Sequence, residues 1–371
     1  MASIKKRPNG RWRARYRDSN NKEHASHFDT RAAAQQWLDA VTADLVRGTY
    51  VDPKAGKVTF GVFAEQWLAS QTFDDSSREA VMSRLRVHLL PRFSGTELRA
   101  IRPSAIQAWL RGRQEKCAPT YVRVQLANLS AILGAAVDDG LIAKNPCASR
   151  SVRAPAVEQK LIIPWGHERT AAVIAAHPDR YRAMPIVAAG CGLRQGEIFG
   201  LRAEDVDFLR HKLSVRQQVK LVGGKPRTAP PKRGKTREIP LPESVALALA
   251  ERLRAVPAGD DGLIFKSREN GLMNRSYYNT HIWKPALRVA GVAPTRENGM
   301  HALRHFYASV LLDAGENIRA LADYLGHSDP GFTLRVYTHL MPNSEDRARR
   351  AVDAVLGPPA DYSRTTGAEK N

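Results

Sequence analysis

Apolar and charged positions alternate along residues 11–17, near the start of the chain. A period of two predicts a β-strand that turns one kind of side chain to each face of a sheet. The apolar positions are Trp12, Ala14 and Tyr16, and the charged ones are Arg11, Arg13, Arg15 and Arg17. Turn-forming residues at 8–10 and 19–21 flank this run, so we expect residues 3–28 to form a three-stranded antiparallel sheet.

A helical period replaces the alternation after residue 28. Trp37, Val41 and Leu45 recur every four residues, and Asp29 or Thr30 could cap the helix that they predict. This helix would cover the apolar face of the sheet and leave the arginines on the other face as a basic plate. Such a plate fits the ~12 Å wide major groove of DNA. The alternative is a solvated edge strand with scattered charge.

Four amphipathic helical patterns follow a linker at residues 51–57. They cover residues 60–69, 76–90, 103–113 and 119–138. A Ser-x-x-Glu sequence from Ser76 to Glu79 predicts a capping box, and Pro103 is typical of a first helical turn. We therefore expect an all-α bundle over residues 58–150, whose basic residues suit either a DNA-facing surface or ordinary solvated helix faces.

The last region, residues 161–356, follows a second linker at residues 149–160. It opens with helical patterns, changes to short β-type runs between residues 205 and 242, and becomes helical again at Glu243. A short amphipathic helix is expected at residues 347–356, and the polar tail 357–371 is expected to be disordered. The predicted fold class is multidomain: a small α+β domain, an all-α bundle, and a mainly α domain with a small β-sheet.

The net charge of the chain indicates what kind of molecule it binds. The 371 residues include 57 Lys+Arg and 37 Asp+Glu, which gives a formal charge of +20. Such a balance indicates an anionic polymer as partner, with nucleic acid ahead of membrane. No run approaches the ~20 apolar residues of a membrane-spanning helix, so an intracellular protein is expected. Three cysteines without a CxxC pair predict neither a disulfide framework nor a zinc site.

Arg194 is the first candidate for chemistry. It follows a glycine pair and precedes a helical pattern through Ile198, where free backbone N–H groups favour an anion. Glu197, three residues later, could brace its guanidinium. An exposed arginine at a helix end is the alternative.

Further candidates lie near the C-terminus. His301 and Arg304 are three residues apart and therefore share one face of a helix. His327 follows a glycine at a helix end, and Tyr337 comes ten residues later. These histidines lack the HExxH spacing and have no Cys or carboxylate set around them, so no metal site is expected.

The order of these segments resembles the tyrosine recombinase family, also called the phage integrase family: Arg, Lys in a β-turn, His-x-x-Arg, Gly-His and Tyr. The resemblance covers all three predicted regions. Because of the basic sheet, the chain is most similar to integrases of temperate phages, and among them to those of actinobacterial phages. It implies an arm-type DNA-binding domain with its linker at 1–57, a core-binding domain at 58–150 and a catalytic domain at 161–356.

The resemblance also implies a reaction and a set of roles. Such enzymes cleave and rejoin DNA through a 3′-phosphotyrosine bond, without a cofactor or a metal. The implied roles are Tyr337 as nucleophile, Arg194 and Arg304 as phosphate-binding residues, His301 as base, His327 as a further phosphate ligand and Lys232 as the acid that protonates the leaving group. Lys235 remains an alternative to Lys232, because the length of this hairpin varies. DNA contacts in the first region are assigned to Lys5, Lys6, Arg7, Arg11, Arg13, Arg15 and Arg17.

The implied partners are double-stranded DNA with arm-type and core-type attachment sites, and a homotetramer on that DNA. A host DNA-bending protein and an excision accessory protein are also expected, and a membrane is not. The expected location is the cytoplasm of the host bacterium, at the nucleoid. A type IB topoisomerase-like enzyme and a non-catalytic DNA-binding regulator are the alternative functions.

Overall fold

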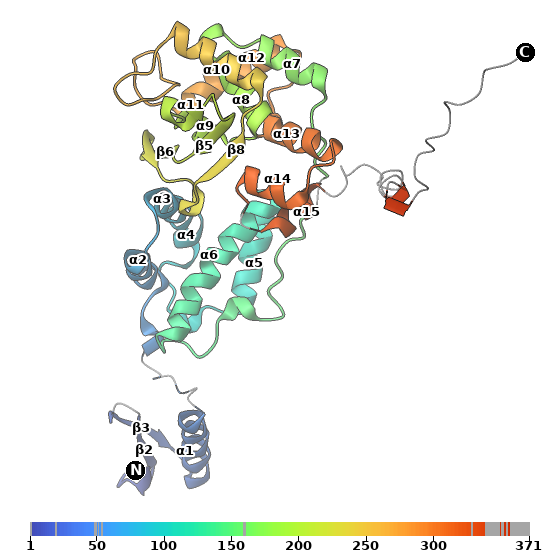
Figure 1. Ribbon diagram of the computed structural model, residues 1–371. Helices are drawn as coiled ribbons and strands as arrows, with labels where there is room; N and C mark the ends of the chain where they lie inside the picture. The colour runs from blue at the N-terminus through green and yellow to red at the C-terminus, as the bar shows by residue number, and fades with distance from the viewer. Residues whose placement is uncertain are drawn as a thin grey trace, which may run out of the picture. The chain divides into compact units, whose positions relative to one another are not determined.

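The computed structural model describes residues 2–18, 21–47, 50, 52, 55–158, 161–327, 329–337, 349, 352–353 and 355–356. The chain divides into two compact units, Met1–Glu158 and Gln159–Asn371 (Figure 1). The first holds a small sheet with one helix and a helical bundle, and the second is mainly helical with short strands. This is the predicted fold class. The boundaries predicted for the three regions stay predictions, and the tail 357–371 lies outside the described residues.

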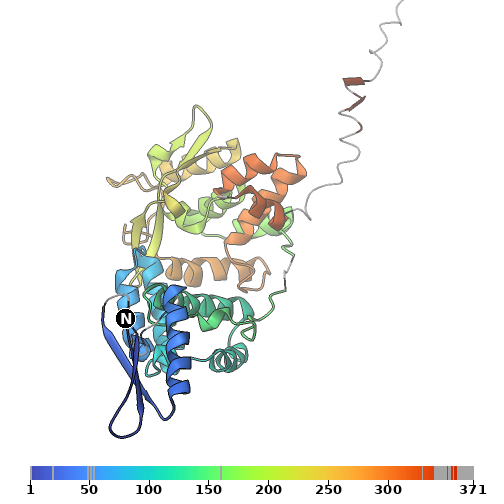
Figure 2. The ribbon, with the colours of Figure 1, turned by 90° about the horizontal axis from the view of Figure 1, so that it is seen from below.

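The first unit begins with an antiparallel sheet in the order β1-β2-β3. Its elements are β1 (Ser3–Lys6), β2 (Trp12–Arg17), β3 (Glu23–Phe28) and α1 (Arg31–Val46). Ala14 and Tyr16 are buried at 0% and 2% exposure, as the alternation predicts. Helix α1 packs against β2 and β3, and it is seen alongside the strands in Figure 2. Of the two candidate caps, Thr30 is the one that accepts a hydrogen bond, from the Ala33 N–H.

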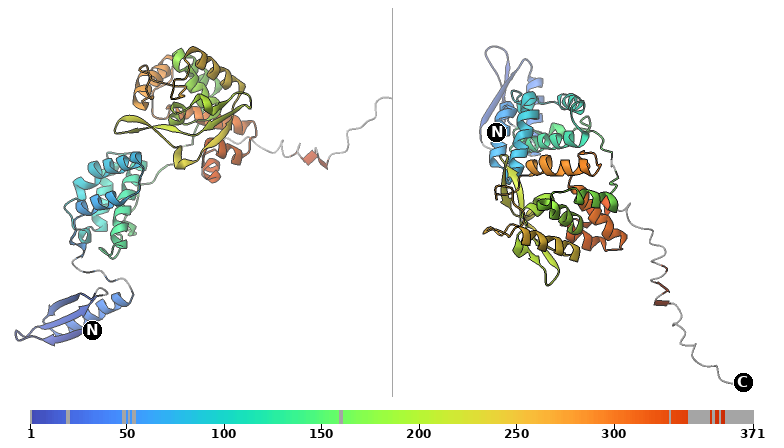
Figure 3. Two further views of the ribbon diagram at one scale, coloured as in Figure 1. Left: turned by 60° about the vertical axis from the view of Figure 1, so that its left-hand side comes forward. Right: turned by 90° about the horizontal axis from the view of Figure 1, so that it is seen from above.

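A helical bundle completes this unit (Figure 3, left). Its elements are η1 (Ala55–Lys57), α2 (Phe60–Ser70), α3 (Asp75–Arg84), η2 (Leu85–Leu89), α4 (Leu90–Phe93), η3 (Leu98–Ala100), α5 (Pro103–Gln114), α6 (Pro119–Asp138) and η4 (Pro146–Ala148). Phe60, Ile106 and Leu129 are fully buried in its core. The capping box predicted at Ser76 is wrong, because Asp74 accepts the backbone N–H groups of Ser76 and Ser77 and starts α3 earlier.

The second unit alternates helices with short strands. Its helices are α7 (His167–Ala175), α8 (Asp179–Cys191), α9 (Gln195–Phe199), η5 (Ala203–Asp205), η6 (Lys232–Gly234), α10 (Glu243–Ala255), α11 (Arg275–Tyr278), η7 (Asn279–Trp283), α12 (Lys284–Val289), α13 (His301–Asp313), α14 (Ile318–Leu325) and α15 (Pro330–Tyr337). Its strands are β4 (Val206–Asp207), β5 (Lys212–Val215), β6 (Gln218–Val222), β7 (Lys225–Ala229) and β8 (Arg237–Pro240). Helix α8 packs against both α10 and α13.

The strands form one antiparallel sheet in the order β4-β5-β8 and a separate hairpin, β6-β7. Gly223 and Gly224 make the hairpin turn, and both have positive φ, at 57° and 73°. A two-residue turn of this kind matches the twist of the strands it joins. The chain then passes through η6 into β8, which places the lysine-rich segment between two strands.

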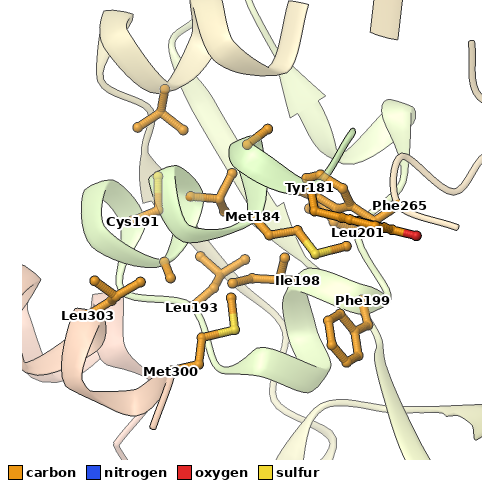
Figure 4. Close-up of a cluster of buried hydrophobic side chains, with 14 of the residues drawn as sticks. Tyr181, Met184, Cys191, Leu193, Ile198, Phe199, Leu201, Phe265, Met300 and Leu303 are labelled. Atoms are coloured by element: carbon orange, nitrogen blue, oxygen red, sulfur yellow. The ribbon is translucent and has the colours of Figure 1, made fainter. Parts of the chain in front are cut away.

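The core of this unit holds the segment around Arg194 in place. Leu193, Ile198 and Leu201 are almost fully buried. Figure 4 shows Leu193 and Ile198 between Met184 of α8 and Met300, and Leu201 beside Phe265. A well-packed core fixes its backbone closely, because interiors are packed as densely as organic crystals. The backbone that carries Arg194 is therefore fixed against α8 and the start of α13.

Gly192 connects α8 to this segment with φ 65°, a left-handed conformation that favours glycine. A Cβ at this position would collide with the ring of Tyr307, which belongs to α13. The glycine thus allows the loop before Arg194 to approach the helix that carries Arg304.

Candidate active site

One cavity of about 490 Å³ in the second unit collects residues from distant parts of the chain. Its lining residues are Arg194, Glu197, Pro231, Lys232, Lys235, Arg237, His301, Arg304, Gly326, His327, Asp329, Phe332 and Arg335. The cavity is therefore lined by every residue predicted for catalysis except Tyr337, which is not among its lining residues.

Arg194 reaches the cavity from the N-cap position of α9. Glu197 accepts its backbone N–H at 2.9 Å and its Nη1 at 2.9 Å, so the predicted brace between these residues is present. Arg194 Nη2 donates to the Gly326 carbonyl at 3.3 Å. Its side chain keeps 27% exposure, which leaves the guanidinium held in place but open to a ligand.

Arg237 completes a buried ion-pair cluster that sequence reasoning missed. Its Nη1 and Nη2 donate to the two oxygens of Glu197 at 3.0 and 2.7 Å, and its Nε donates to the Tyr324 carbonyl at 2.8 Å. The carboxyl of Glu197 is buried, which alone would raise its pKa, but Arg237 and Arg194 hold that pKa at about 2. A signal existed in the sequence: Arg237 lies two residues before the apolar Ile239, so in a strand both side chains point to the same, inward face.

Arg304 is the most deeply buried of the predicted residues, at 1% exposure. Its Nη1 donates to the Gly192 carbonyl at 2.6 Å, and its Nη2 donates to the Leu325 carbonyl at 2.5 Å and to His327 Nε2 at 3.0 Å. Burial and the neighbouring Arg194 lower its pKa to about 9. It stays charged at neutral pH, and backbone carbonyls fix its direction.

The contacts of His327 define its tautomer. A guanidinium can only donate, so His327 Nε2 accepts from Arg304 and carries no proton. His327 Nδ1 lies 2.7 Å from Thr333 Oγ1 and is the protonated nitrogen, which donates to that hydroxyl. Burial and Arg304 lower the pKa of this imidazole to about 3, so it is neutral at physiological pH.

His301 begins α13 and opens onto the cavity, with Arg304 one turn further along the helix. Its side chain keeps access to solvent, but partial desolvation by the surrounding protein, together with His305 and Arg304, lowers its pKa to about 4. Its ring packs edge-on against His305, with centroids 4.7 Å apart. His301 is therefore a neutral imidazole that contacts a second imidazole.

Tyr337 ends α15 and is 1% exposed. It packs in a small apolar cluster with Tyr307, Leu321 and Leu325. Its Oη lies 2.7 Å from Nδ1 of His305, and burial raises the pKa of the phenol to about 12. The residue predicted as nucleophile is thus a shielded, neutral phenol in this structure.

His305 was missed by the sequence analysis, which assigned the base to His301. The i to i+4 spacing of the two histidines could have indicated it, because residues four apart share a helix face. The structure places His305, and not the predicted His301, in the described hydrogen bond with the phenol.

Lys232 and Lys235 both line the cavity, and both are exposed. They lie in and just after η6, the short turn between the β6-β7 hairpin and β8. The structure does not separate the two lysines as candidates for the acid.

Carboxylates of the first unit itself neutralise part of the charge of the basic plate. Arg13 and Arg15 contact the two oxygens of Glu23 at 3.2 and 3.5 Å, and Arg11 pairs with Asp29 at 2.9 Å. Sequence reasoning took repulsion among the arginines as a sign of an external anion. Because β2 pairs with β3, the sheet itself supplies the carboxylate of Glu23, and repulsion among the arginines does not require an external anion.

The remaining predicted DNA contacts separate into two faces. Lys5 pairs with Arg13 across the sheet, so both face outward. Lys6 pairs with Trp12 instead, and its Nζ lies 5.9 Å from the centre of that indole ring. Arg7 lies at the exposed turn after β1, and Arg17 contacts Asn21. Lys6 is therefore not part of the plate.

Metal sites and membrane-spanning helices are both lacking among the described residues. Within those residues, no group of three or more His, Cys, Asp or Glu side chains is placed to hold a metal ion. In the same part of the chain, no helix is both long and apolar enough to cross a membrane.

Comparison with protein families gives two matches. The phage integrase family matches residues 168–344, and the N-terminal domain of phage integrases matches residues 2–47. A putative prophage phiRv2 integrase of Mycobacterium tuberculosis is 28% identical over 345 residues, covering 91% of this chain and 90% of the relative.

Solved structures agree in fold. The integrase of transposon Tn1549, solved with a circular intermediate DNA, has a TM-score of 0.67 at 19% identity and covers 80% of this chain and 99% of its own. A lambda integrase tetramer bound to a Holliday junction has a TM-score of 0.60 at 18% identity, covering 88% and 96%.

These matches favour a recombinase over a topoisomerase-like enzyme or a non-catalytic regulator, and they confirm the resemblance seen in the motifs. The chain belongs to the phage integrase family and is a tyrosine-type site-specific recombinase.

Proposed function

We propose that this recombinase integrates and excises phage DNA at attachment sites, with Tyr337 as the nucleophile. One observation carries the proposal: Arg194 and Arg304 line the same cavity, and Tyr337 Oη is hydrogen-bonded to His305, the residue that follows Arg304. Two guanidiniums and a phenol are the groups that phosphoryl transfer to tyrosine requires.

The two arginines offset the negative charge of the phosphodiester and of its transition state. A phosphodiester repels nucleophiles, and its pentavalent transition state gathers charge on the non-bridging oxygens. Arg194 and Arg304 can donate bidentate, charge-assisted hydrogen bonds to those oxygens. Both side chains are already held at the cavity, Arg194 by Glu197 and Arg304 by backbone carbonyls, before a substrate arrives.

The covalent step exchanges one ester for another. Tyr337 Oη gives its proton to a histidine of α13, for which the family resemblance implies His301, and bonds to phosphorus. The bond from phosphorus to O5′ breaks, and a 3′-phosphotyrosine and a free 5′-hydroxyl result. O5′ takes a proton, which we assign to Lys232 with Lys235 as the alternative. His327 adds a hydrogen bond to the phosphate once Nε2 is released from Arg304 and takes up a proton, which the negative charge of the bound phosphate favours. No cofactor is needed, because the phosphotyrosine keeps the bond energy for rejoining.

The described arrangement must change for cleavage. Tyr337 is 1% exposed, and Arg304 has Nη donors on Gly192, Leu325 and His327. We propose that DNA binding moves α15 so that the phenol enters the cavity, while the phosphate takes over donors of Arg304.

We assign the other regions by the same proposal. Residues 1–57 bind arm-type sites through Lys5, Arg13 and Arg15, and residues 58–150 bind the core site. The lambda integrase neighbour is a tetramer on a Holliday junction, and we extend a tetramer on DNA to this chain. A host bending protein and an excision accessory protein would assist it at the nucleoid of the host cell.

The direct test replaces Tyr337 by Phe and challenges the protein with nicked attachment-site DNA. We expect no covalent adduct and nearly unchanged DNA binding, whereas the matched control Tyr277→Phe, at an exposed tyrosine, forms the adduct like the parent. A persistent adduct in Tyr337→Phe would exclude Tyr337 as nucleophile.

A substrate with a different leaving group can show whether Lys232 or Lys235 is the acid. A substrate with sulfur in place of O5′ leaves without protonation, because a thiolate is a far weaker base than an alkoxide. We expect Lys232→Ala to lose cleavage on normal DNA and to regain it on the sulfur substrate. The same behaviour in Lys235→Ala, with Lys232→Ala normal, would transfer the role to Lys235.

A further inference from the structure

We infer that His305 is a catalytic residue of strand cleavage: its Nδ1 orients Oη of Tyr337 and accepts the phenolic proton as Oη bonds to phosphorus. This inference rests on the proposed function and names the base of that same site. The role differs from the one implied by the family resemblance, which gives the base to His301.

The contact between His305 and Tyr337 is the first observation that supports this role. His305 Nδ1 lies 2.7 Å from Tyr337 Oη, a good distance for a strong hydrogen bond, and the two ring centroids are 5.7 Å apart. A general base must lie within hydrogen-bond reach of the proton that it removes. His305 already meets this condition before DNA is bound.

The neighbouring histidines are differently engaged. His327 uses Nε2 for Arg304 and Nδ1 for Thr333. His301 packs edge-on against the ring of His305. The ring in contact with the phenol is that of His305, and His301 contacts His305 in turn.

The position of His305 in α13 couples it to the phosphate. It follows Arg304 directly, so the proton acceptor and a phosphate-binding guanidinium come from one turn of one helix. Movement of α15 can then bring the phenol toward the phosphate without taking it out of reach of α13.

The charge state of His305 suits an acceptor. Burial and Arg304 lower its pKa to about 4, so the imidazole is unprotonated at neutral pH. A bound phosphodiester brings a negative charge beside Arg304, which offsets the effect of that cation and raises the proton affinity of His305.

The proton balance is closed in both directions. During cleavage the phenolic proton moves to His305 Nδ1, the electron pair of Oη forms the new bond to phosphorus, and O5′ leaves with a proton from the hairpin lysine. During rejoining, the 5′-hydroxyl returns its proton to the hairpin lysine and O5′ bonds to phosphorus, the bond from phosphorus to Oη breaks, and His305 returns its proton to Oη.

The test combines His305→Gln with a change in the phenol. The Gln amide can hydrogen-bond Oη but cannot take up a proton, so we expect single-turnover cleavage to fall about 100-fold or more, within the usual range for general acid–base catalysis. Placing 3,5-difluorotyrosine at position 337 lowers the pKa of the phenol and should restore at least a tenth of the lost rate. His301→Gln, carrying the same fluorinated residue, is the matched control and should gain little from it.

Three results would overturn the inference: cleavage by His305→Gln at near-parent rate, a defect that fluorination does not relieve, or relief confined to His301→Gln. DNA binding and a thermal melt monitor folding, and His305→Asn replaces the Gln variant if that variant unfolds. Failure of the proposed function is a separate result, because the unmodified chain would then form no covalent adduct.

Discussion

Two parts of this recombinase use arginine in opposite ways. On the outer face of the N-terminal sheet, Arg11, Arg13 and Arg15 keep 31–50% of their side-chain surface exposed and share nearby carboxylates. In the catalytic cavity, Arg304 is 1% exposed and Arg237 keeps 9%. The same functional group is therefore a surface charge in one region and a fixed structural element in the other.

Exposure to solvent explains why the two groups of arginines behave differently. An exposed ion pair is screened by water and salt and contributes about 0–1 kcal/mol, so a DNA phosphate can replace it at little cost. Removing one partner of a buried pair costs about 3–5 kcal/mol, because a charge is left without compensation. The sheet is thus suited to binding a charged polymer, and the cavity is suited to holding a transition state.

The largest effect is expected from Arg304→Lys. An ammonium lacks the planar fork and cannot satisfy Gly192, Leu325 and His327 together, so the fold and the chemistry should suffer at once. We expect cleavage to fall by about 1,000-fold or more and the free energy of unfolding to drop by about 1–3 kcal/mol, because buried acceptors lose their donors. Suicide-substrate kinetics and urea unfolding measure the two effects, with Arg254→Lys, at an exposed arginine of α10, as control. A stable, active Arg304→Lys would remove the contrast between the regions.

Arg194→Lys should separate chemistry from stability. Its guanidinium is partly exposed, and Glu197 keeps its bidentate partner Arg237 when Arg194 changes. We expect cleavage to slow by about 100- to 1,000-fold, the usual cost of one lost transition-state donor, with unfolding free energy changed by about 1 kcal/mol or less. Near-normal cleavage would contradict the phosphate-binding role of Arg194.

Acid should weaken the cavity through its histidines. The pKa values of His301, His305 and His327 are about 4, 4 and 3, below the ordinary value of 6.5. Above pH 6.5 these groups are neutral in both states and their contribution to stability is complete. As the pH falls from 6.5 toward 4, the unfolded chain binds protons that the folded chain does not, so stability declines.

Thermal melts between pH 7.5 and 4.5 test this window. We expect the melting temperature of the catalytic unit to fall with pH, and His327→Gln to show a smaller fall. The matched control His281→Gln, at an exposed histidine, should retain the full slope. An unchanged slope in His327→Gln would mean that this imidazole is not held neutral by its surroundings.

The smallest effects are expected at the sheet. Arg13→Ala should weaken binding to arm-type DNA about tenfold or less, evenly across sequences, and reduce the salt slope by about one. Glu23→Gln frees two guanidiniums and should raise affinity a few-fold. Gel shifts at several salt concentrations measure both, and Arg47→Ala, beyond α1, serves as control. A loss of affinity in Glu23→Gln would show that this carboxylate organises the plate and does not merely compete with DNA.

Local patterns predicted much of the fold. The alternation at residues 11–17 identified the buried side of β2, and the periodic runs located α2, α5 and α6 to within a residue or two. Errors came where neighbouring side chains compete, as at the start of α3, where Asp74 caps the helix before Ser76 can. Local spacing therefore predicts where a helix lies, but it does not decide which of two nearby side chains caps it.

The sequence alone determined the candidate residues for the chemistry, because Arg194, Arg304, His327 and Tyr337 occur in motifs whose order is recognisable. Only the tertiary structure decided which groups touch: that Arg237 closes on Glu197, that Glu23 neutralises part of the plate, and that His305 holds the phenol. The reason is physical. Periodicity reports which way a side chain faces within its own element, whereas a hydrogen bond between elements depends on how the core packs them together, and no local spacing encodes that distance.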